Sequence, residues 1–149
     1  MIVWHGTPNK FQEFDLRFSD DGFIHFGSFS QARERLEKIS ESGQEWILLK
    51  CEISINNPVT DMPDIGDWSD HQLLAEAILD TQTDDGLREI AKRYLNKPYR
   101  FTGTDPCLEM KVEIEALGFD GIIYSNTAEG GCESYAIFNA EQARILSRI

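Results

Sequence analysis

Two histidines and one glutamate are the residues of this sequence best placed to do chemistry. His5 closes a short apolar run at the start of the chain, just before Gly6, and His25 lies in a second short run over residues 23–26. A strand histidine beside glycine can face a cleft, although a partly buried structural histidine has the same sequence environment. Glu133 directly precedes an apolar run, so sheet hydrogen bonds would hold its carboxylate in place. We therefore predict a cleft that brings His5 and Glu133 together.

Other kinds of site are not indicated. His71 lies in an acidic helical stretch, which predicts a solvated surface group. No HxxxH or HExxH pair occurs, and Cys51, Cys107 and Cys132 lack zinc-ligand spacing, so no metal site is predicted. The absence of GxGxxG and GxxxxGK[ST] argues against a Rossmann or P-loop nucleotide site. Ser28 lacks the sequence context of a nucleophile elbow.

Short strands near both ends of the chain must position these residues. Apolar patterns and turn residues predict strands over residues 1–5, 23–26, 45–55, 122–124, 134–138 and 144–149. A helix begins after Ser28 or Ser30, and its buried stripe is predicted to be Phe29, Ala32, Leu36 and Ile39. Residues 126–131 form a glycine-rich loop, and residues 139–142 a single helical turn.

The middle of the chain, about residues 59–104, is acidic and irregularly patterned. It predicts one helix around residues 73–79 and another from Asp84 or Asp85 to Leu95. We interpret this block as an insertion that covers one end of a sheet. A third helix is predicted over residues 107–117, with a buried stripe of Leu108, Val112 and Ala116.

The length of 149 residues fits one domain, residues 1–149. Strands at both ends, helices between them and late strands that close the sheet predict an α+β fold with mixed or antiparallel sheets. No signal peptide or membrane-spanning run is evident, and three cysteines without CxxC spacing point to a reducing cytoplasm.

The net charge of −12 bears on partners. Nucleic acids and anionic membrane surfaces both attract cationic proteins, so neither is an expected partner. Acidity can serve solubility alone, or it can present a surface to a basic partner.

Four short motifs, in order, resemble ADP-ribosyltransferase-like domains of the diphtheria-toxin type, especially the small versions in polyvalent proteins of phages and mobile elements. The motifs are His5-Gly-Thr-Pro-Asn9, Phe23-Ile-His-Phe-Gly27, Gly118-Phe-Asp-Gly-Ile-Ile123 and Glu133-Ser-Tyr-Ala-Ile-Phe138. The likeness covers roughly the first 55 and the last 35 residues and leaves the acidic middle unmatched. It implies two split sheets with NAD held as a co-substrate between them.

The resemblance also implies roles for residues. Glu133, His5 and His25 would be catalytic, with Glu133 stabilising the oxocarbenium-like ribose that forms when nicotinamide leaves. His5 would bind a ribose hydroxyl and His25 would stack on nicotinamide, where the family usually has tyrosine. The remaining cofactor-binding residues would be Gly6, Thr7, Phe26, Ser28 and Ser134.

Besides His25, the sequence can depart from the family pattern in the register of its last apolar strand. Alignment of the last apolar strand can put Ser134 in the catalytic position, and a one-residue slip turns the Glu133 carboxylate to the other face.

Three hypotheses about function follow. The first is ADP-ribose transfer to an unknown acceptor, or NAD hydrolysis. The second is a catalytically degenerate acidic protein that binds or inhibits a basic partner. The third is an RNA 2′-phosphotransferase-like use of the fold through Lys92, Arg93, Lys97 and Arg100, which a solvated helix face explains equally well.

Overall fold

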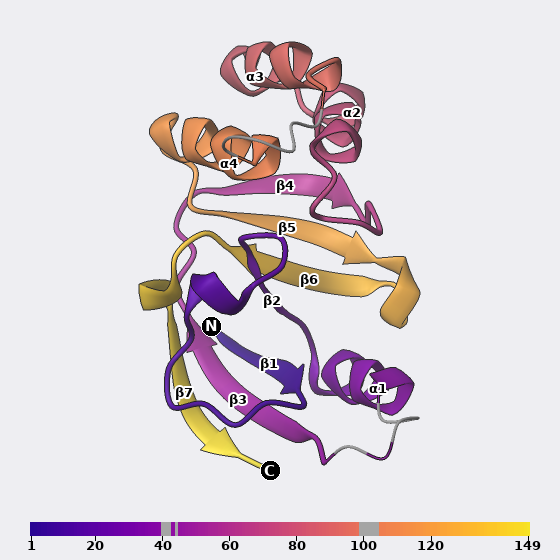
Figure 1. Ribbon diagram of the computed structural model, residues 1–149, viewed down its shortest axis with the longest axis vertical. Helices are drawn as coiled ribbons and strands as arrows, with labels where there is room; N and C mark the ends of the chain where they lie inside the picture. Colours follow the sequence, from indigo (N-terminus) through magenta and orange to yellow (C-terminus); the bar gives the residue numbers. More distant parts are fainter. Residues whose placement is uncertain (40–42, 44, 99–104) are drawn as a thin grey trace.

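Two sheets form the framework of the protein (Figure 1). The computed structural model describes residues 1–39, 43, 45–98 and 105–149. The first sheet is antiparallel, in the order β1-β3-β7, and consists of β1 (Ile2–Thr7), β3 (Ile47–Ile53) and β7 (Ala143–Arg148). The second has the order β2-β6-β5-β4 and consists of β2 (Ile24–Phe26), β4 (Pro58–Pro63), β5 (Gly121–Asn126) and β6 (Cys132–Ile137).

The second sheet is mixed, because β4 runs parallel to β5 while the other neighbours are antiparallel. The two sheets meet where Trp4 and Gly27 exchange backbone hydrogen bonds of 2.9 and 3.0 Å. The predicted α+β class with mixed and antiparallel sheets is confirmed.

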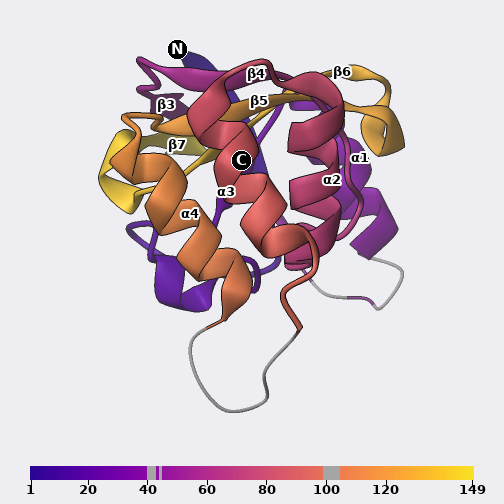
Figure 2. The ribbon, with the colours of Figure 1, turned by 90° about the horizontal axis from the view of Figure 1, so that it is seen from above.

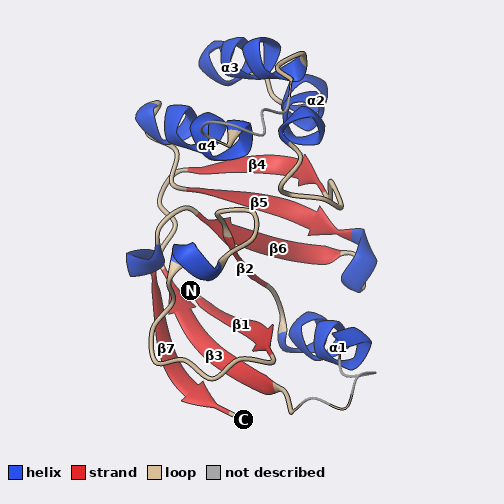
Figure 3. Ribbon diagram, in the orientation of Figure 1, coloured by secondary structure: helices blue, strands red, loops and turns tan. Residues whose placement is uncertain are grey.

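Four α-helices lie in the described residues, in two places. Their bounds are α1 (Phe29–Ile39), α2 (His71–Thr81), α3 (Asp85–Leu95) and α4 (Pro106–Ala116). Helix α1 lies beside β1, apart from the others (Figure 3). Helices α2, α3 and α4 gather beyond β4 and β5, as the view from that end shows (Figure 2). None of the helices in the described ranges is long and apolar enough to cross a membrane.

Aspartates begin three of these helices. The carboxylates of Asp70, Asp84 and Asp105 each accept backbone N–H groups of the first turn of α2, α3 and α4, respectively. Such a cap contributes about 1 kcal/mol to helix stability. Part of the acidity of the middle segment is therefore structural.

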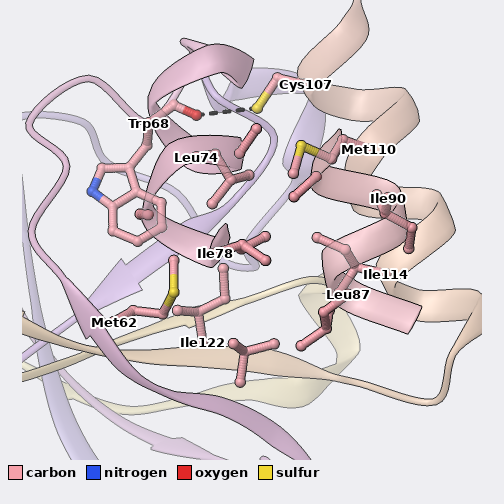
Figure 4. Close-up of a cluster of buried hydrophobic side chains, with 14 of the residues drawn as sticks. Met62, Trp68, Leu74, Ile78, Leu87, Ile90, Cys107, Met110, Ile114 and Ile122 are labelled. Atoms are coloured by element: carbon pink, nitrogen blue, oxygen red, sulfur yellow. Dashed lines mark hydrogen bonds between the residues drawn. The ribbon is translucent and has the colours of Figure 1, made fainter. Parts of the chain in front are cut away.

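A large apolar core lies between α2–α4 and the second sheet (Figure 4). Leu74, Ile78, Met110 and Ile114 are fully buried there against Ile122 of β5. A second core lies around the first sheet, where Val3, Leu49 and Cys51 pack with Phe26 and Ile137. The cores cover opposite faces of the second sheet, because neighbouring residues of a strand point to opposite sides.

Between residues 58 and 116 the structure differs from the sequence-based expectations in three places. Strand β4 was not expected, because only Val59 and Met62 of its residues are buried and the register shifts between them. In α4, Leu108 and Val112 are exposed at 38% and 59%. The buried face instead contains Cys107, Met110, Lys111 and Ile114. His71 is buried, and its Nε2 bonds the Lys97 carbonyl oxygen at 2.5 Å.

The predictions for α1, for the two turns and for the terminal strands also have outcomes in the structure. In α1, Ala32 and Leu36 are buried, whereas Phe29 is 43% exposed, and the side chain of Ile39 lies outside the described residues. The 3₁₀ turns η3 (Thr127–Glu129) and η4 (Ala140–Gln142) occupy the predicted loop and helical turn. The predicted strands at both ends of the chain are confirmed.

Candidate functional site

A small cleft lies where α1 and the ends of β1 and β2 meet β5, β6 and η3. Five of the residues selected from sequence line it: His5, Gly6, His25, Phe26 and Ser134. The polar residues that complete its wall were not selected: Arg35, Tyr124, Asn126 and Glu129. The cleft volume is about 20 Å³, room for about one water molecule.

His5 is held among aromatic rings on β1. Its ring lies 5.3 Å from that of Phe14 and 5.6 Å from that of Phe26. Its Nδ1 donates to the His25 carbonyl oxygen at 2.8 Å, and since a carbonyl only accepts, Nδ1 carries the proton. Burial lowers the pKa of His5 from 6.5 to about 4. His5 is therefore a neutral group at neutral pH.

His25 uses both ring nitrogens for hydrogen bonds. Its Nε2 lies 2.9 Å from Oδ2 of Asp21, and its Nδ1 lies 3.0 Å from the hydroxyl of Tyr124. The ring meets Trp68 and Tyr124 edge-on, with centroids 5.3 and 5.8 Å apart. This environment fixes the imidazole as a hydrogen-bonded link between strands β2 and β5.

Ser134 is the residue of β6 that faces the cleft. It is 1% exposed and sits directly opposite Tyr124 in the β5–β6 ladder. Its Oγ accepts hydrogen bonds of 3.2 Å from the side-chain amides of Gln31 and Asn126. Ser134 therefore connects α1, β5 and β6 at the base of the cleft.

Glu129 supplies a carboxylate to the cleft. Its Oε2 accepts from Asn126 Nδ2 at 3.0 Å, and its backbone N–H donates to Asn126 Oδ1 at 3.1 Å. Burial raises the pKa of Glu129, and the positive charge of Arg35 partly offsets that rise. The nearby Lys38 donates to the carbonyl oxygen of Ala128 at 2.7 Å, which ties η3 to α1.

The structure does not bring His5 and Glu133 together. Glu133 is exposed and absent from the cleft wall, and it lies on the face of β6 opposite to Ser134. Two other selected residues also lie outside the cleft wall. Thr7 is buried and accepts the Asn9 N–H at 3.1 Å, and Ser28 accepts the Gln31 N–H at 3.2 Å at the start of α1.

Gly6 is required by the packing of α1. A Cβ at this position would lie 2.6 Å from the Ala32 carbonyl oxygen and 2.7 Å from Cγ of Leu36. The Gly6 peptide groups point to the edge of β1 that carries the Trp4–Gly27 bridge, because backbone groups alternate along a strand. Gly6 therefore lets α1 approach the cleft wall closely.

NAD matches this site in chemistry but not in size. Arg35 provides a positive charge for phosphates, while Asn126, Glu129 and Ser134 offer hydrogen-bonding atoms for sugar hydroxyls. A volume of about 20 Å³ does not admit a dinucleotide. The cleft would have to open before it could hold NAD. Among the described residues, no cluster of three or more His, Cys, Asp or Glu is arranged to hold a metal ion.

The cations considered for a phosphate site are engaged elsewhere. Lys92 pairs with Glu89 at 3.1 Å, Arg93 pairs with Glu113 at 2.8 Å, and Lys97 contacts Glu109. Arg100 lies outside the described residues.

Comparisons with known proteins establish no family. No family model matches the sequence, and no curated protein matches it. Two solved structures are distantly similar. One is from the M. tuberculosis MbcT–MbcA toxin–antitoxin complex, with 9% identity over 99% of this chain and 82% of that chain and a TM-score of 0.47. The other is an anti-CRISPR protein, with 14% identity over 98% of this chain and 95% of that chain and a TM-score of 0.41.

Little in the sequence marks the four polar cleft residues that were not selected. Tyr124 lies within the predicted strand over residues 122–124 and shares a face with Ile122, which strand alternation could have indicated. Asn126 and Glu129 lie in the polar glycine-rich loop, where no periodicity selects one residue over another. Arg35 lies on the exposed side of α1, and its proximity to Glu129 arises only when α1 packs beside η3.

Proposed function

We propose that the protein is an NAD-using ADP-ribosyltransferase-like protein, which transfers ADP-ribose to an acceptor or hydrolyses NAD, and that Glu129 provides the carboxylate of its site. The observation that carries the proposal is the cleft wall itself, in which a partly buried carboxylate, a serine, a tyrosine and an arginine meet. A carboxylate fixed in such a site stabilises a positively charged sugar. The sequence motifs add His5 and Gly6 on the adjoining strand.

Opening of the η3 turn would give a ligand access. This turn ends in Gly130 and Gly131, which have positive φ angles of 87° and 73°. No neighbouring atom lies within 4 Å of a Cβ built at either glycine, so packing does not restrain them. The turn is held to α1 by the exposed hydrogen bond from Lys38 to the Ala128 carbonyl oxygen. Its other hydrogen bonds, from Glu129 and Gly131, go to Asn126 at the end of β5. Moving the turn away from α1 therefore breaks fewer hydrogen bonds than separating a strand from its sheet.

A comparison of two glutamates tests the proposal. Nicotinamide release from NAD is measured for the wild type, Glu129→Gln and Glu133→Gln, with a cell lysate as acceptor source. We expect Glu129→Gln to lower the rate about 100- to 1000-fold, the usual effect of removing a group that stabilises transition-state charge. We expect Glu133→Gln to retain activity, because its side chain is exposed and outside the cleft wall. The reverse result would return the catalytic role to Glu133.

An acidic binding protein is the second candidate. Residues 51–87 contain no lysine or arginine and nine acidic residues: Glu52, Asp61, Asp64, Asp67, Asp70, Glu76, Asp80, Asp84 and Asp85. A long segment of one sign favours a partner of the opposite sign. If the wild type releases no nicotinamide and NAD causes no thermal shift, this candidate replaces the first. It requires a basic protein partner whose binding weakens with salt and with Asp61→Asn/Asp64→Asn/Asp67→Asn.

A further inference from the structure

A line of hydrogen-bonded side chains connects the cleft to Asp21. Tyr124 lines the cleft, its hydroxyl bonds His25 Nδ1 at 3.0 Å, and His25 Nε2 bonds Asp21 Oδ2 at 2.9 Å. The other oxygen of Asp21 accepts the Phe23 N–H and the Ser19 hydroxyl, both at 2.9 Å. The carboxylate is therefore fixed by bonds independent of the histidine.

Two amides beside the line each have one orientation. Gln31 Oε1 accepts the backbone N–H of Ser28 at 2.7 Å, so its Nε2 faces Ser134. Asn126 Oδ1 accepts the backbone N–H of Glu129, so its Nδ2 also faces Ser134. A backbone N–H can only donate, which leaves each amide one orientation. Ser134 Oγ thus receives two hydrogen bonds.

The remaining protons then follow in one order. The Asp21 carboxylate only accepts, so His25 carries a proton on Nε2 and donates it to Asp21. In a neutral imidazole the other ring nitrogen accepts. Tyr124 therefore donates its hydroxyl proton to His25 Nδ1. Each donor in the line points away from the cleft and towards the aspartate.

We propose that Tyr124, His25 and Asp21 form a proton relay that serves the cleft as its general base. The substrate class is an O–H nucleophile, either water or an alcohol. This inference rests on the proposed function, because it supplies the base for the group that attacks the sugar.

The relay conserves atoms and charge. As the nucleophile's oxygen bonds to the sugar carbon, the bond from that carbon to nicotinamide breaks and nicotinamide leaves as a neutral molecule. The O–H bond of the nucleophile breaks, and its proton moves to the oxygen of Tyr124. The phenolic proton of Tyr124 moves at the same time to Nδ1 of His25. The resulting imidazolium keeps its Nε2–H bond to the Asp21 carboxylate. Nothing is oxidised or reduced.

The surroundings suit a relay of this kind. Burial raises the pKa of Tyr124, so the phenol passes a proton on rather than standing ionised. Burial acts to raise the pKa of Asp21 as well, but its hydrogen bonds to His25, to the Phe23 N–H and to Ser19 bring that pKa below its ordinary value. Asp21 therefore remains a carboxylate, and it can stabilise the imidazolium form of His25.

The test compares Tyr124→Phe and Asp21→Asn with Tyr135→Phe. Tyr135 lies on the opposite face of the same sheet, outside the cleft wall, and is the matched control. Tyr124→Phe keeps the ring that packs 4.6 Å from Trp68. Nicotinamide release is measured with and without methanol, and methyl ADP-ribose, detected by mass spectrometry, separates the alcohol from water as acceptor.

We expect Tyr124→Phe and Asp21→Asn to lower kcat about 100-fold, the usual contribution of general-base catalysis, with KM nearly unchanged. Tyr135→Phe should match the wild type. Nitrogen-15 NMR of the imidazole rings should show His25 protonated on Nε2 and unprotonated on Nδ1. If the substitutions only disturbed packing, KM would rise, or the melting temperature would fall along with kcat.

The outcomes separate this inference from the proposed function. A wild type that releases nicotinamide, with Tyr124→Phe equally active, overturns the relay and leaves the function standing. A His25 tautomer protonated on Nδ1 also overturns the relay, because the line would then run in the opposite direction. A wild type that releases no nicotinamide overturns the function and the catalytic role of the relay together.

Discussion

His5 is a histidine whose buried surroundings favour its neutral form. Its ring contacts three phenylalanines, Phe11, Phe14 and Phe26, and its Nδ1–H is used by the His25 carbonyl oxygen. A positive charge on this ring would be poorly solvated. At the scale of one residue, His5 is therefore a positioning group, and its protonation weakens the fold.

The stability of the protein should consequently fall between pH 6.5 and pH 4. Burial lowers the folded-state pKa of His5 from 6.5 to about 4, so the unfolded chain binds more protons in this window. Stability therefore rises with pH across the window, by up to about 3 kcal/mol. We expect urea unfolding at pH 4.5 and pH 7 to show a larger difference for the wild type than for His5→Gln. Equal differences would mean that His5 titrates normally in the folded state.

Helix α1 is the element whose placement shapes the cleft. It approaches β1 at Gly6, and its Gln31 reaches Ser134 on β6. Its Lys38 reaches the η3 turn on the far side. One helix thus holds together a strand of the first sheet, a strand of the second and the loop that carries Glu129.

Gly6→Ala should separate this helix from the sheet. The added methyl group would meet the Ala32 carbonyl oxygen at 2.6 Å, so α1 must shift. Overpacking of this kind costs about 1–3 kcal/mol. Gly130→Ala is the matched control: its neighbourhood is open, and only its left-handed backbone, at φ of 87°, adds about 1 kcal/mol. Urea unfolding gives both values, and a smaller loss for Gly6→Ala than for the control would contradict the packing argument.

At the scale of the whole molecule, two apolar cores are joined through the second sheet. One core contains Trp68, and the other lies around the first sheet. Trp4 on β1 of that sheet packs against a smaller cluster of Ala32, Leu36 and Leu48. Strand β6 contributes Ala136 to the first core and Ile137 to the second. Because one strand is shared, loss of either core disrupts the other.

We therefore expect the chain to unfold as a single domain. Variants that keep only Trp4 or only Trp68 as the fluorescent tryptophan should show coincident urea transitions. Trp46 is 41% exposed and can be replaced by Phe in both variants. Transitions with different midpoints would show that the two sheets unfold separately, and the single-domain assignment would then be wrong.

Local pattern determined most of the elements. Short apolar runs, alternation, helical spacing and turn residues predicted β1, β2, β3, β5, β6 and β7, and also α1 to α4. The resemblance also selected five residues of the cleft wall. These predictions depend on residues that are close together in the sequence, so they can be made from one sequence.

Tertiary structure decided the remainder. Strand β4 is held by parallel pairing with β5, and the buried face of α4 is set by its fit against α2 and α3. The presence of Glu129 rather than Glu133 in the cleft wall depends on which face of β6 turns inward and on how η3 meets α1. The line from Asp21 to Tyr124 joins residues 103 positions apart in sequence. Such contacts leave no periodic trace in a sequence, because they arise only when separate elements pack together.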